Sequence, residues 1–274
     1  MSHDPSHSLA RMSTSHGLLA ERTTLVVGVD EIGAGIARRF VREGARVAVV
    51  ATDDRSQVKP ETVPAGDVIY VTGVAAAEPE RVAAAVSDAI ARLGRPLDVI
   101  VCNLLPAANP CPLDRLETTD LDSSLRRVQA TAAAMRTALP SLRESGRGRV
   151  VIVGHRYGES VGEALGAYNA AAWSLVGLAR TAALEWGQYQ VATNVLLPLA
   201  RTAEFDAARE RRPKVIDLLV SQLPMRRVGD PVEDVGGAAV FLASDAACFV
   251  NGEVVCADGG QQVAGPVLNP ARFG

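Results

Sequence analysis

Residues 23–51 read TTLVVGVDEIGAGIARRFVREGARVAVVA, and this stretch decides the fold. Thr24 to Val27 is a short β-branched run that ends at a glycine, which predicts a buried strand. Ile32 to Glu43 has helical spacing and is followed by Gly44, which predicts a helix with a glycine at its C-terminal end. Arg46 to Ala51 is again apolar and predicts the next strand. Together these segments predict a strand–helix–strand unit of a parallel sheet.

The same alternation continues along the rest of the chain. Further strands are predicted at residues 67–72, 97–102, 149–153, 191–197 and 253–257, and further helices at 78–93, 121–142, 168–186 and 232–244. This order predicts an α/β fold that is Rossmann-like and doubly wound, with a mostly parallel seven-stranded sheet in a single domain. We expect the domain at 22–264, between disordered tails at 1–21 and 265–274. The charged segment 201–226, with a helix inside, stands where a substrate lid is expected.

Length, charge and cysteine content argue against several classes of protein. With 274 residues, 48% of them hydrophobic, the chain can bury one large core. A net charge of −3 without a long basic run argues against nucleic-acid binding. No segment predicts a signal peptide or a membrane anchor. The four cysteines lie far apart without metal-ligand spacing, so we expect no metal site and a cytoplasmic location.

Three stretches in the C-terminal third carry a specific resemblance to a known family. They are LPMRRVGDPVEDV (223–235), VFLASDAA (240–247) and NGEVVCADGG (251–260), and they resemble short-chain dehydrogenase/reductases. Segments 38–47, 97–101, 148–151 and 167–169 fall in the family's order and spacing as well, so the resemblance covers residues 22–262. It implies a doubly wound fold, an NAD(P) cofactor, oxidoreductase activity, and dimers or tetramers.

The glycine-rich turn departs from the family's pattern. Gly28, Gly33 and Gly35 stand where the family places glycines that let backbone amides approach the cofactor's diphosphate. Asp30 and Glu31 add two carboxylates beside that position, and like charge repels a phosphate. The alternative interpretation is an ordinary turn with solvated acids.

Other cofactor positions are also altered. Asn103 keeps the place of a family asparagine, but Leu104 and Leu105 replace the small residues after it and are expected to project where the cofactor's ribose would pass. Ala51 and Thr52 stand where an acid or base would bind the adenosine ribose or its phosphate, and Leu199 replaces a glycine of the nicotinamide pocket. We therefore expect no cofactor, and NAD(P) only if these positions still function.

The catalytic positions have lost their usual side chains. Tyr168 corresponds to the family's acid/base tyrosine, but the lysine expected four residues later is Ala172 and the expected serine is His155. The family's asparagine falls on Arg127, or on Val128 if the register shifts by one. A tyrosine pKa near 10 leaves only about a thousandth of the side chain ionised at neutral pH, so without a neighbouring cation Tyr168 is a poor base.

Three functions remain compatible with these residues. The favoured one is an auxiliary, non-redox subunit that forms a homo-oligomer, or a hetero-oligomer with an intact member of the family, through the alanine-rich helices at 129–138 and 169–179. The second is a cofactor-independent isomerase, dehydratase or cyclase in which His155 and Tyr168 transfer protons and Arg127 binds an anionic group of a small-molecule ligand. His155 could equally fill a relic cleft. The third is an atypical NAD(P)-dependent oxidoreductase.

Overall fold

The computed structural model describes residues 17–52, 68–105, 108–156 and 162–264, and these form one doubly wound domain. Seven strands hydrogen-bond in the order β3-β2-β1-β4-β5-β6-β7, and every pairing is parallel. Their bounds are β1 (Thr23–Val27), β2 (Arg46–Thr52), β3 (Ile69–Val74), β4 (Val99–Cys102), β5 (Arg149–Val153), β6 (Ala192–Pro198) and β7 (Val254–Ala257). The strand order reverses between β1 and β4, and ligands of such sheets bind outside the carboxyl ends of the strands at this point.

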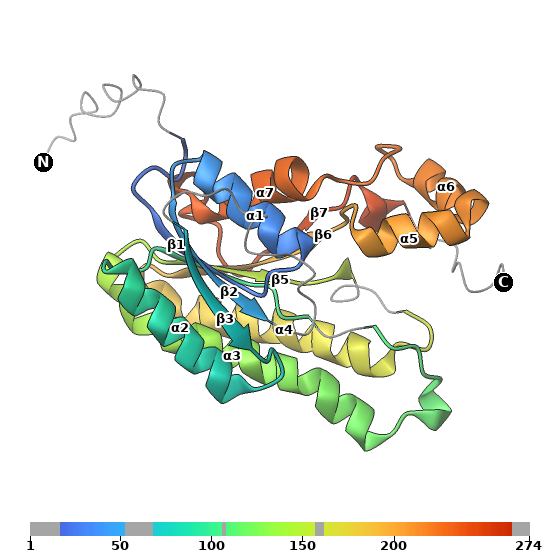
Figure 1. Cartoon of the computed structure of the whole chain (residues 1–274), viewed down its shortest axis with the longest axis horizontal. Coiled ribbons are helices and arrows are strands. Elements are labelled where there is room, and N and C mark those ends of the chain that lie inside the picture. The colour runs from blue at the N-terminus through green and yellow to red at the C-terminus, as the bar shows by residue number, and fades with distance from the viewer. Residues whose placement is uncertain (1–16, 53–67, 106–107, 157–161, 265–274) are drawn as a thin grey trace, which may run out of the picture.

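Helices cover both faces of the sheet (Figure 1). On one face lie α1 (Glu31–Arg42) and α7 (Gly236–Ala243), and on the other lie α2 (Pro79–Leu93), α3 (Thr118–Ser145) and α4 (Gly166–Trp186). The core is accordingly divided into two apolar clusters, one on each side of the sheet. Two further helices, α5 (Ala203–Arg211) and α6 (Pro213–Gln222), lie apart from these layers at one end of the molecule.

The structure confirms the predicted sheet and corrects several boundaries. The third strand begins at Ile69, two residues after its predicted start, and the segment predicted to contain one helix contains both α5 and α6. The predicted helix at 232–244 is a π-helical turn, Pro231–Val235, followed by α7. The predicted disordered tail ended at residue 21, but Leu19 is fully buried and its amide donates to the carbonyl of Glu43. The domain therefore includes residues 17–21, while 1–16 and 265–274 lie outside the described residues.

Helix α3 is longer than the apolar pattern indicated. Its N-terminus is fixed by a capping box in which Glu117 accepts from the third amide of the helix and Asp120 accepts from the amide of Glu117. Its C-terminus ends at Gly146, which has a positive φ of 67°. The helix runs through Pro140 without ending there. The helix is therefore longer than its apolar residues predict, because polar capping residues add a turn at its N-terminus.

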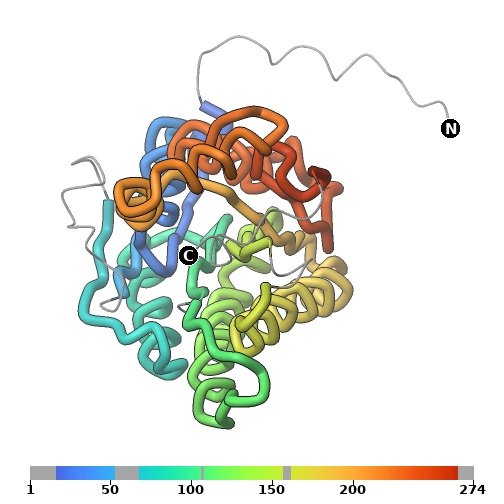
Figure 2. Tube along the Cα trace, turned by 90° about the vertical axis from the view of Figure 1, so that its right-hand side faces the viewer, coloured from blue at the N-terminus to red at the C-terminus, as the bar shows by residue number. Residues whose placement is uncertain are grey.

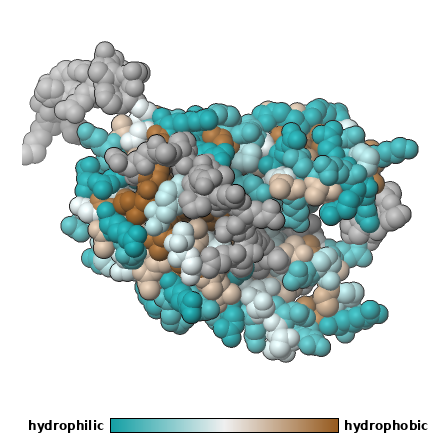
Figure 3. All heavy atoms as spheres, viewed as in Figure 1, coloured by the Kyte–Doolittle hydropathy of each residue, from teal (hydrophilic) through white to brown (hydrophobic). Residues whose placement is uncertain are grey.

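Hydrophilic side chains predominate on the face seen in Figure 3, and at its upper right, where α5 and α6 lie, they are interspersed with smaller hydrophobic patches. No helix in the described part of the chain is long and apolar enough to cross a membrane. The polar surface of α5 and α6 agrees with the charged composition of the segment 201–226.

Candidate functional site

A cleft with a volume of about 660 Å³ opens at the carboxyl ends of the strands. Figure 2 views the molecule from this end, with α5 and α6 in orange across the upper part. The loops after β1, β4, β5 and β6 line the cleft together with the N-terminal half of α5. Its described polar lining residues are Asp30, Glu31, Asn103, Asn109, His155, Tyr168, Thr202 and Glu204. Three of these are carboxylates, and none of the described lining residues is a lysine or an arginine.

Asp30 is the N-cap of α1, and its carboxylate occupies the first turn of that helix. Its Oδ1 atom accepts from the amides of Ile32 at 2.9 Å and Gly33 at 3.0 Å. The amide group of Asn103 donates to the same oxygen at 2.8 Å. Free amides at a helix N-terminus would otherwise need an external acceptor. Asp30 is only partly buried, and its Oδ1 atom is engaged by three donors of the chain.

The three glycines of this turn and of α1 serve close backbone contacts in this structure. Gly28 has a φ of +88°, and a Cβ atom there would lie 2.1 Å from the carbonyl oxygen of Asn103. A Cβ on Gly33 would lie 2.2 Å from the carbonyl oxygen of Gly28. Gly35 is not among the described lining residues of the cleft, and a Cβ there would meet the carbonyl of Pro231 at 2.5 Å. The three glycines are thus explained by packing of the turn and of α1.

The two leucines after Asn103 point in different directions. Leu104 is buried in the core cluster beneath α2 and α3 and does not line the cleft, so its predicted projection toward a ribose is wrong. Leu105 does line the cleft and is almost fully buried. Asn103 is buried between them and the first turn, where it also donates to the carbonyl of Gly28 at 3.1 Å.

His155 and Tyr168 lie together in the cleft, as the family positions that they occupy implied. His155 follows β5 and Tyr168 stands in the first turn of α4, with ring centroids 5.5 Å apart and planes at 81°. Burial, assisted by the charge of Arg156, lowers the pKa of His155 to about 4. The imidazole is therefore neutral at physiological pH. Ala172, one turn after Tyr168 on α4, is 2% exposed and presents only a methyl group.

Arg127 is not among the residues that line the cleft. It stands on α3, half-buried, and burial lowers the pKa of its guanidinium. Val128, the alternative position, packs in the core. The predicted anion-binding role of Arg127 in the cleft is therefore not supported.

The structure adds residues that the sequence did not single out. Thr202 is the N-cap of α5, where its hydroxyl accepts from the amide of Phe205 at 3.3 Å, and both residues line the cleft. Glu31 reaches the same helix, since its Oε1 atom accepts from the amide of Ala203 at 3.3 Å. A threonine followed by acids in the next turn is a start signal for a helix and could have located this end of α5.

Known proteins match almost the whole chain. A family model described as "Enoyl-(Acyl carrier protein) reductase" matches residues 28–262. Dehydrogenase/reductase SDR family member 4 of Mus musculus is 30% identical over 256 residues, covering 90% of this chain and 89% of the relative. The chain belongs to the short-chain dehydrogenase/reductase family. A 12alpha-hydroxysteroid dehydrogenase from Clostridium is 30% identical over 260 residues, which cover 89% of this chain and 98% of the relative.

Solved structures of short-chain dehydrogenase/reductases share the fold. Levodione reductase superposes with a TM-score of 0.78 at 25% identity, covering 90% of this chain and 99% of its own. A structure from Beutenbergia cavernae with bound NADP, described as a gluconate 5-dehydrogenase, has a TM-score of 0.77 at 30% identity, covering 89% and 98%. The relatives named here are dehydrogenases and reductases, so the family is one of oxidoreductases.

The described cleft residues do not fit the NAD(P) that the family implies. The amides of Ile32 and Gly33 at the start of α1 already hold a carboxylate rather than being open to a phosphate. Glu31 and Glu204 add negative charge to the lining of the same cleft. A dinucleotide's diphosphate is itself negative, so both the hydrogen bonding at α1 and the charge of the cleft oppose it.

Proposed function

We propose that this member of the short-chain dehydrogenase/reductase family does not perform NAD(P)-dependent hydride transfer and serves as an auxiliary subunit in an assembly of family members. The observation that carries the proposal is the surroundings of Tyr168. The neutral imidazole of His155 contacts its ring, and the residue one turn later on α4 is Ala172, which is buried and carries no charge. A cation beside a tyrosine is what brings its pKa toward neutrality.

The missing charge has a large energetic effect on proton transfer. Ionising a tyrosine with a pKa near 10 at neutral pH costs about 4 kcal/mol, since each tenfold step is about 1.4 kcal/mol. A neutral imidazole supplies no net charge to offset this cost. The described lining residues include no lysine or arginine, and the charge of Arg156, the residue after His155, acts on that imidazole and lowers its pKa. A tyrosine that keeps its ordinary pKa is a poor base at neutral pH.

The outer surface of α4 supports a role in assembly. Trp173 is 48% exposed and Leu184 is 85% exposed. The two lie eleven residues apart, about three helical turns, so they share one face of α4. Gly177 lies between them on the exposed side and permits close approach by another helix. Two large apolar side chains on one exposed helix face are typical of a subunit contact.

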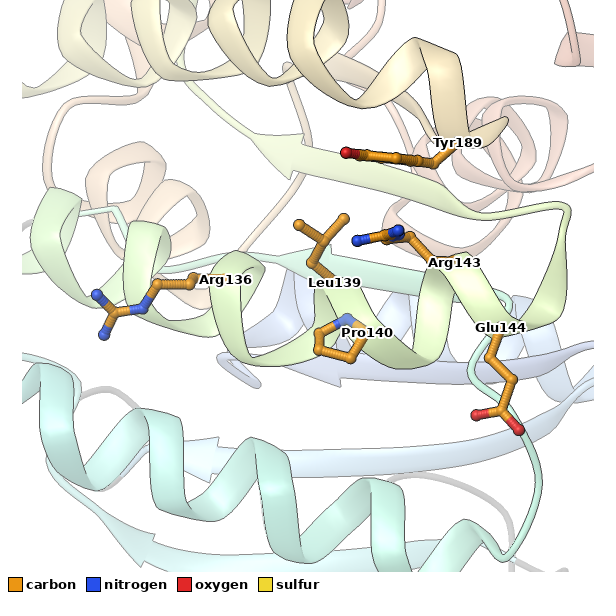
Figure 4. Close-up of a pocket in the computed structure, with 6 residues that line it drawn as sticks. All are labelled: Arg136, Leu139, Pro140, Arg143, Glu144 and Tyr189. Carbon is orange, nitrogen blue, oxygen red and sulfur yellow. The ribbon is translucent and has the colours of Figure 1, made fainter.

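A hollow of about 550 Å³ lies beside this surface, over the C-terminal half of α3 (Figure 4). Leu139 and Pro140 form its apolar floor, and the guanidinium of Arg143 stacks at 3.8 Å from the centroid of the Tyr189 ring. Apolar area with an adjacent arginine and tyrosine matches the composition of protein interfaces. The outer surface of α3 and α4 is therefore where we place the contact with a partner subunit.

Cofactor binding is tested by titrating the purified protein with NADH and NADPH and following fluorescence and heat. The expected result is no saturable binding, with an intact relative measured in parallel as the positive control. Low-micromolar binding to the wild-type protein would contradict the proposal. It would instead favour an atypical NAD(P)-dependent oxidoreductase.

Assembly is tested by isolating the protein from its native host and measuring the mass of the intact complex. We expect a fixed stoichiometry with a second family member that has tyrosine and lysine four residues apart. Leu184→Ser should weaken this complex, whereas Leu218→Ser, on the exposed side of α6, should leave it intact. Isolation only as a monomer or a self-oligomer would refute the mixed assembly.

A second candidate function rests on the contact between His155 and Tyr168. A neutral imidazole in a cleft of about 660 Å³ has a nitrogen lone pair that can accept a proton from an acidic substrate, as in an isomerisation that starts with proton abstraction. The lowered pKa of His155 keeps the imidazole unprotonated at neutral pH, but it also makes it a weaker base than an ordinary histidine. His155→Ala should abolish turnover and leave the melting temperature nearly unchanged. Full activity of that variant would exclude this candidate.

A further inference from the structure

Two adjacent carboxylates engage the N-termini of two helices that border the cleft, α1 and α5. Asp30 accepts from the amides of Ile32 and Gly33 in α1, a helix of twelve residues. Glu31 accepts from the amide of Ala203, the first residue of α5, a helix of nine residues. A single dipeptide therefore satisfies backbone donors from both helices.

The link to α5 joins segments far apart in the sequence. Glu31 and Ala203 are separated by 172 positions, and both belong to or border the lining of the cleft. Helix α5 has no fully buried residue of its own, so few apolar contacts hold it in place. For an element with little buried surface, a hydrogen bond from a charged acceptor is a large share of its attachment.

The turn that precedes Asp30 positions its carboxylate at the N-terminus of α1. Gly28 turns the chain with a positive φ, and the buried amide of Asn103 donates to Asp30 at 2.8 Å. The carboxylate is thus directed at the start of α1 from one side by the backbone and from the other by Asn103. Its position leaves Glu31 at the first residue of α1, where its side chain extends toward Ala203.

We infer that the pair Asp30–Glu31 is an internal substitute for a dinucleotide's diphosphate, which keeps α5 docked over the cleft and excludes diphosphate-containing ligands. The pair places negative charge at two helix N-termini, where phosphates are otherwise bound. The charge belongs to the chain, so α5 is held permanently. The inference extends the cofactor-free part of the proposed function and does not depend on the assembly.

The docking of α5 is tested by hydrogen exchange at the amides of residues 203–205. Glu31→Ala should speed exchange about tenfold, which corresponds to losing one hydrogen bond to a charged acceptor. Glu204→Ala is the matched control, because it removes another carboxylate of the same cleft and keeps the contact between Glu31 and Ala203. Equal exchange in the two variants would overturn the inference.

The exclusion of diphosphates is tested with inorganic pyrophosphate and ADP as probes. Asp30→Asn with Glu31→Gln keeps both hydrogen-bond acceptors and removes both charges, since asparagine caps a helix as well as aspartate. This double variant should bind the probes at least ten times more tightly than the wild-type protein. Equally weak binding in wild type and double variant overturns the exclusion. If the wild-type protein reduced a carbonyl substrate with NADH, the proposed function would be refuted. The docking of α5 is measured independently by the hydrogen-exchange experiment.

Discussion

Lowering the pH should destabilise this protein through one buried side chain, His155. Burial and the charge of Arg156 lower its pKa from 6.5 to about 4 in the folded protein. In the unfolded chain the histidine regains its ordinary pKa. Between these two values the unfolded chain binds a proton that the folded protein does not, so the free energy of unfolding falls as the pH drops from about 6.5 to about 4.

The magnitude follows from the two pKa values. A decrease from 6.5 to about 4 corresponds to at most about 3 kcal/mol of unfolding free energy, reached below the folded pKa. About 2 kcal/mol of this should already be lost at about pH 5, where most carboxylates are still ionised. Burial is the larger cause, so Arg156→Gln should recover only the smaller part of the loss.

The assay is urea unfolding of the wild-type protein and of His155→Gln at neutral pH and at about pH 5. Other titrating groups are common to both proteins, so the difference between their free energies isolates His155. We expect that difference to change by about 2 kcal/mol between the two pH values. The same pH dependence in both proteins would refute the reasoning, as would a proton NMR titration that places His155 near its ordinary pKa.

For three further substitutions the geometry determines whether the free energy of unfolding rises or falls, and chemical denaturation measures the change. Gly28→Ala should lower the free energy of unfolding by about 2 kcal/mol or more, because the residue has a φ of +88° and a Cβ would lie 2.1 Å from the carbonyl of Asn103. Gly177→Ala should raise it by up to about 1 kcal/mol, since the position is helical and open. Ala172→Lys should lower stability by about 2 kcal/mol or more through burial of a charge. It should also lower the pKa of Tyr168, measured by tyrosinate absorbance, and an unchanged pKa would show that residue 172 does not face Tyr168.

The sheet could be predicted from the sequence because β1, β2, β4, β5 and β6 are almost entirely buried and read as apolar runs. The bounds of the third strand were misplaced by two residues because β3 is an edge strand in which only Val74 is buried. A strand with so little burial has a weak hydrophobic pattern at its ends.

Those parts of the candidate site were predicted correctly in which the order of the strands is enough to bring two residues together. His155 and Tyr168 meet because each follows or borders β5 at the carboxyl edge of the sheet. The prediction for Arg127 was not supported because the direction of its side chain depends on its position around the axis of the long helix α3. A shift of one residue along this helix turns a side chain by about 100°. The prediction for Leu104 was wrong because the side chain enters the core on the α2–α3 side of the sheet, and the direction of a side chain in a loop after a strand is not set by the hydrophobic pattern.

Asp30 shows most clearly what the sequence could not provide. From the sequence, the charge of Asp30 beside a glycine-rich turn indicated only that it would repel a phosphate. In the structure its carboxylate also accepts from the two amides at the start of α1 where a phosphate would otherwise bind. To bind at the same amides, a diphosphate must first displace the carboxylate, at a cost of about 1 kcal/mol for the lost cap. It must then lie within about 4 Å of that charge, which costs about 4 kcal/mol at the effective dielectric constant of a protein surface. Together these costs weaken binding several thousandfold. Gly28 and Gly33 therefore allow the tight backbone turn, but we expect this turn not to bind the diphosphate of a dinucleotide.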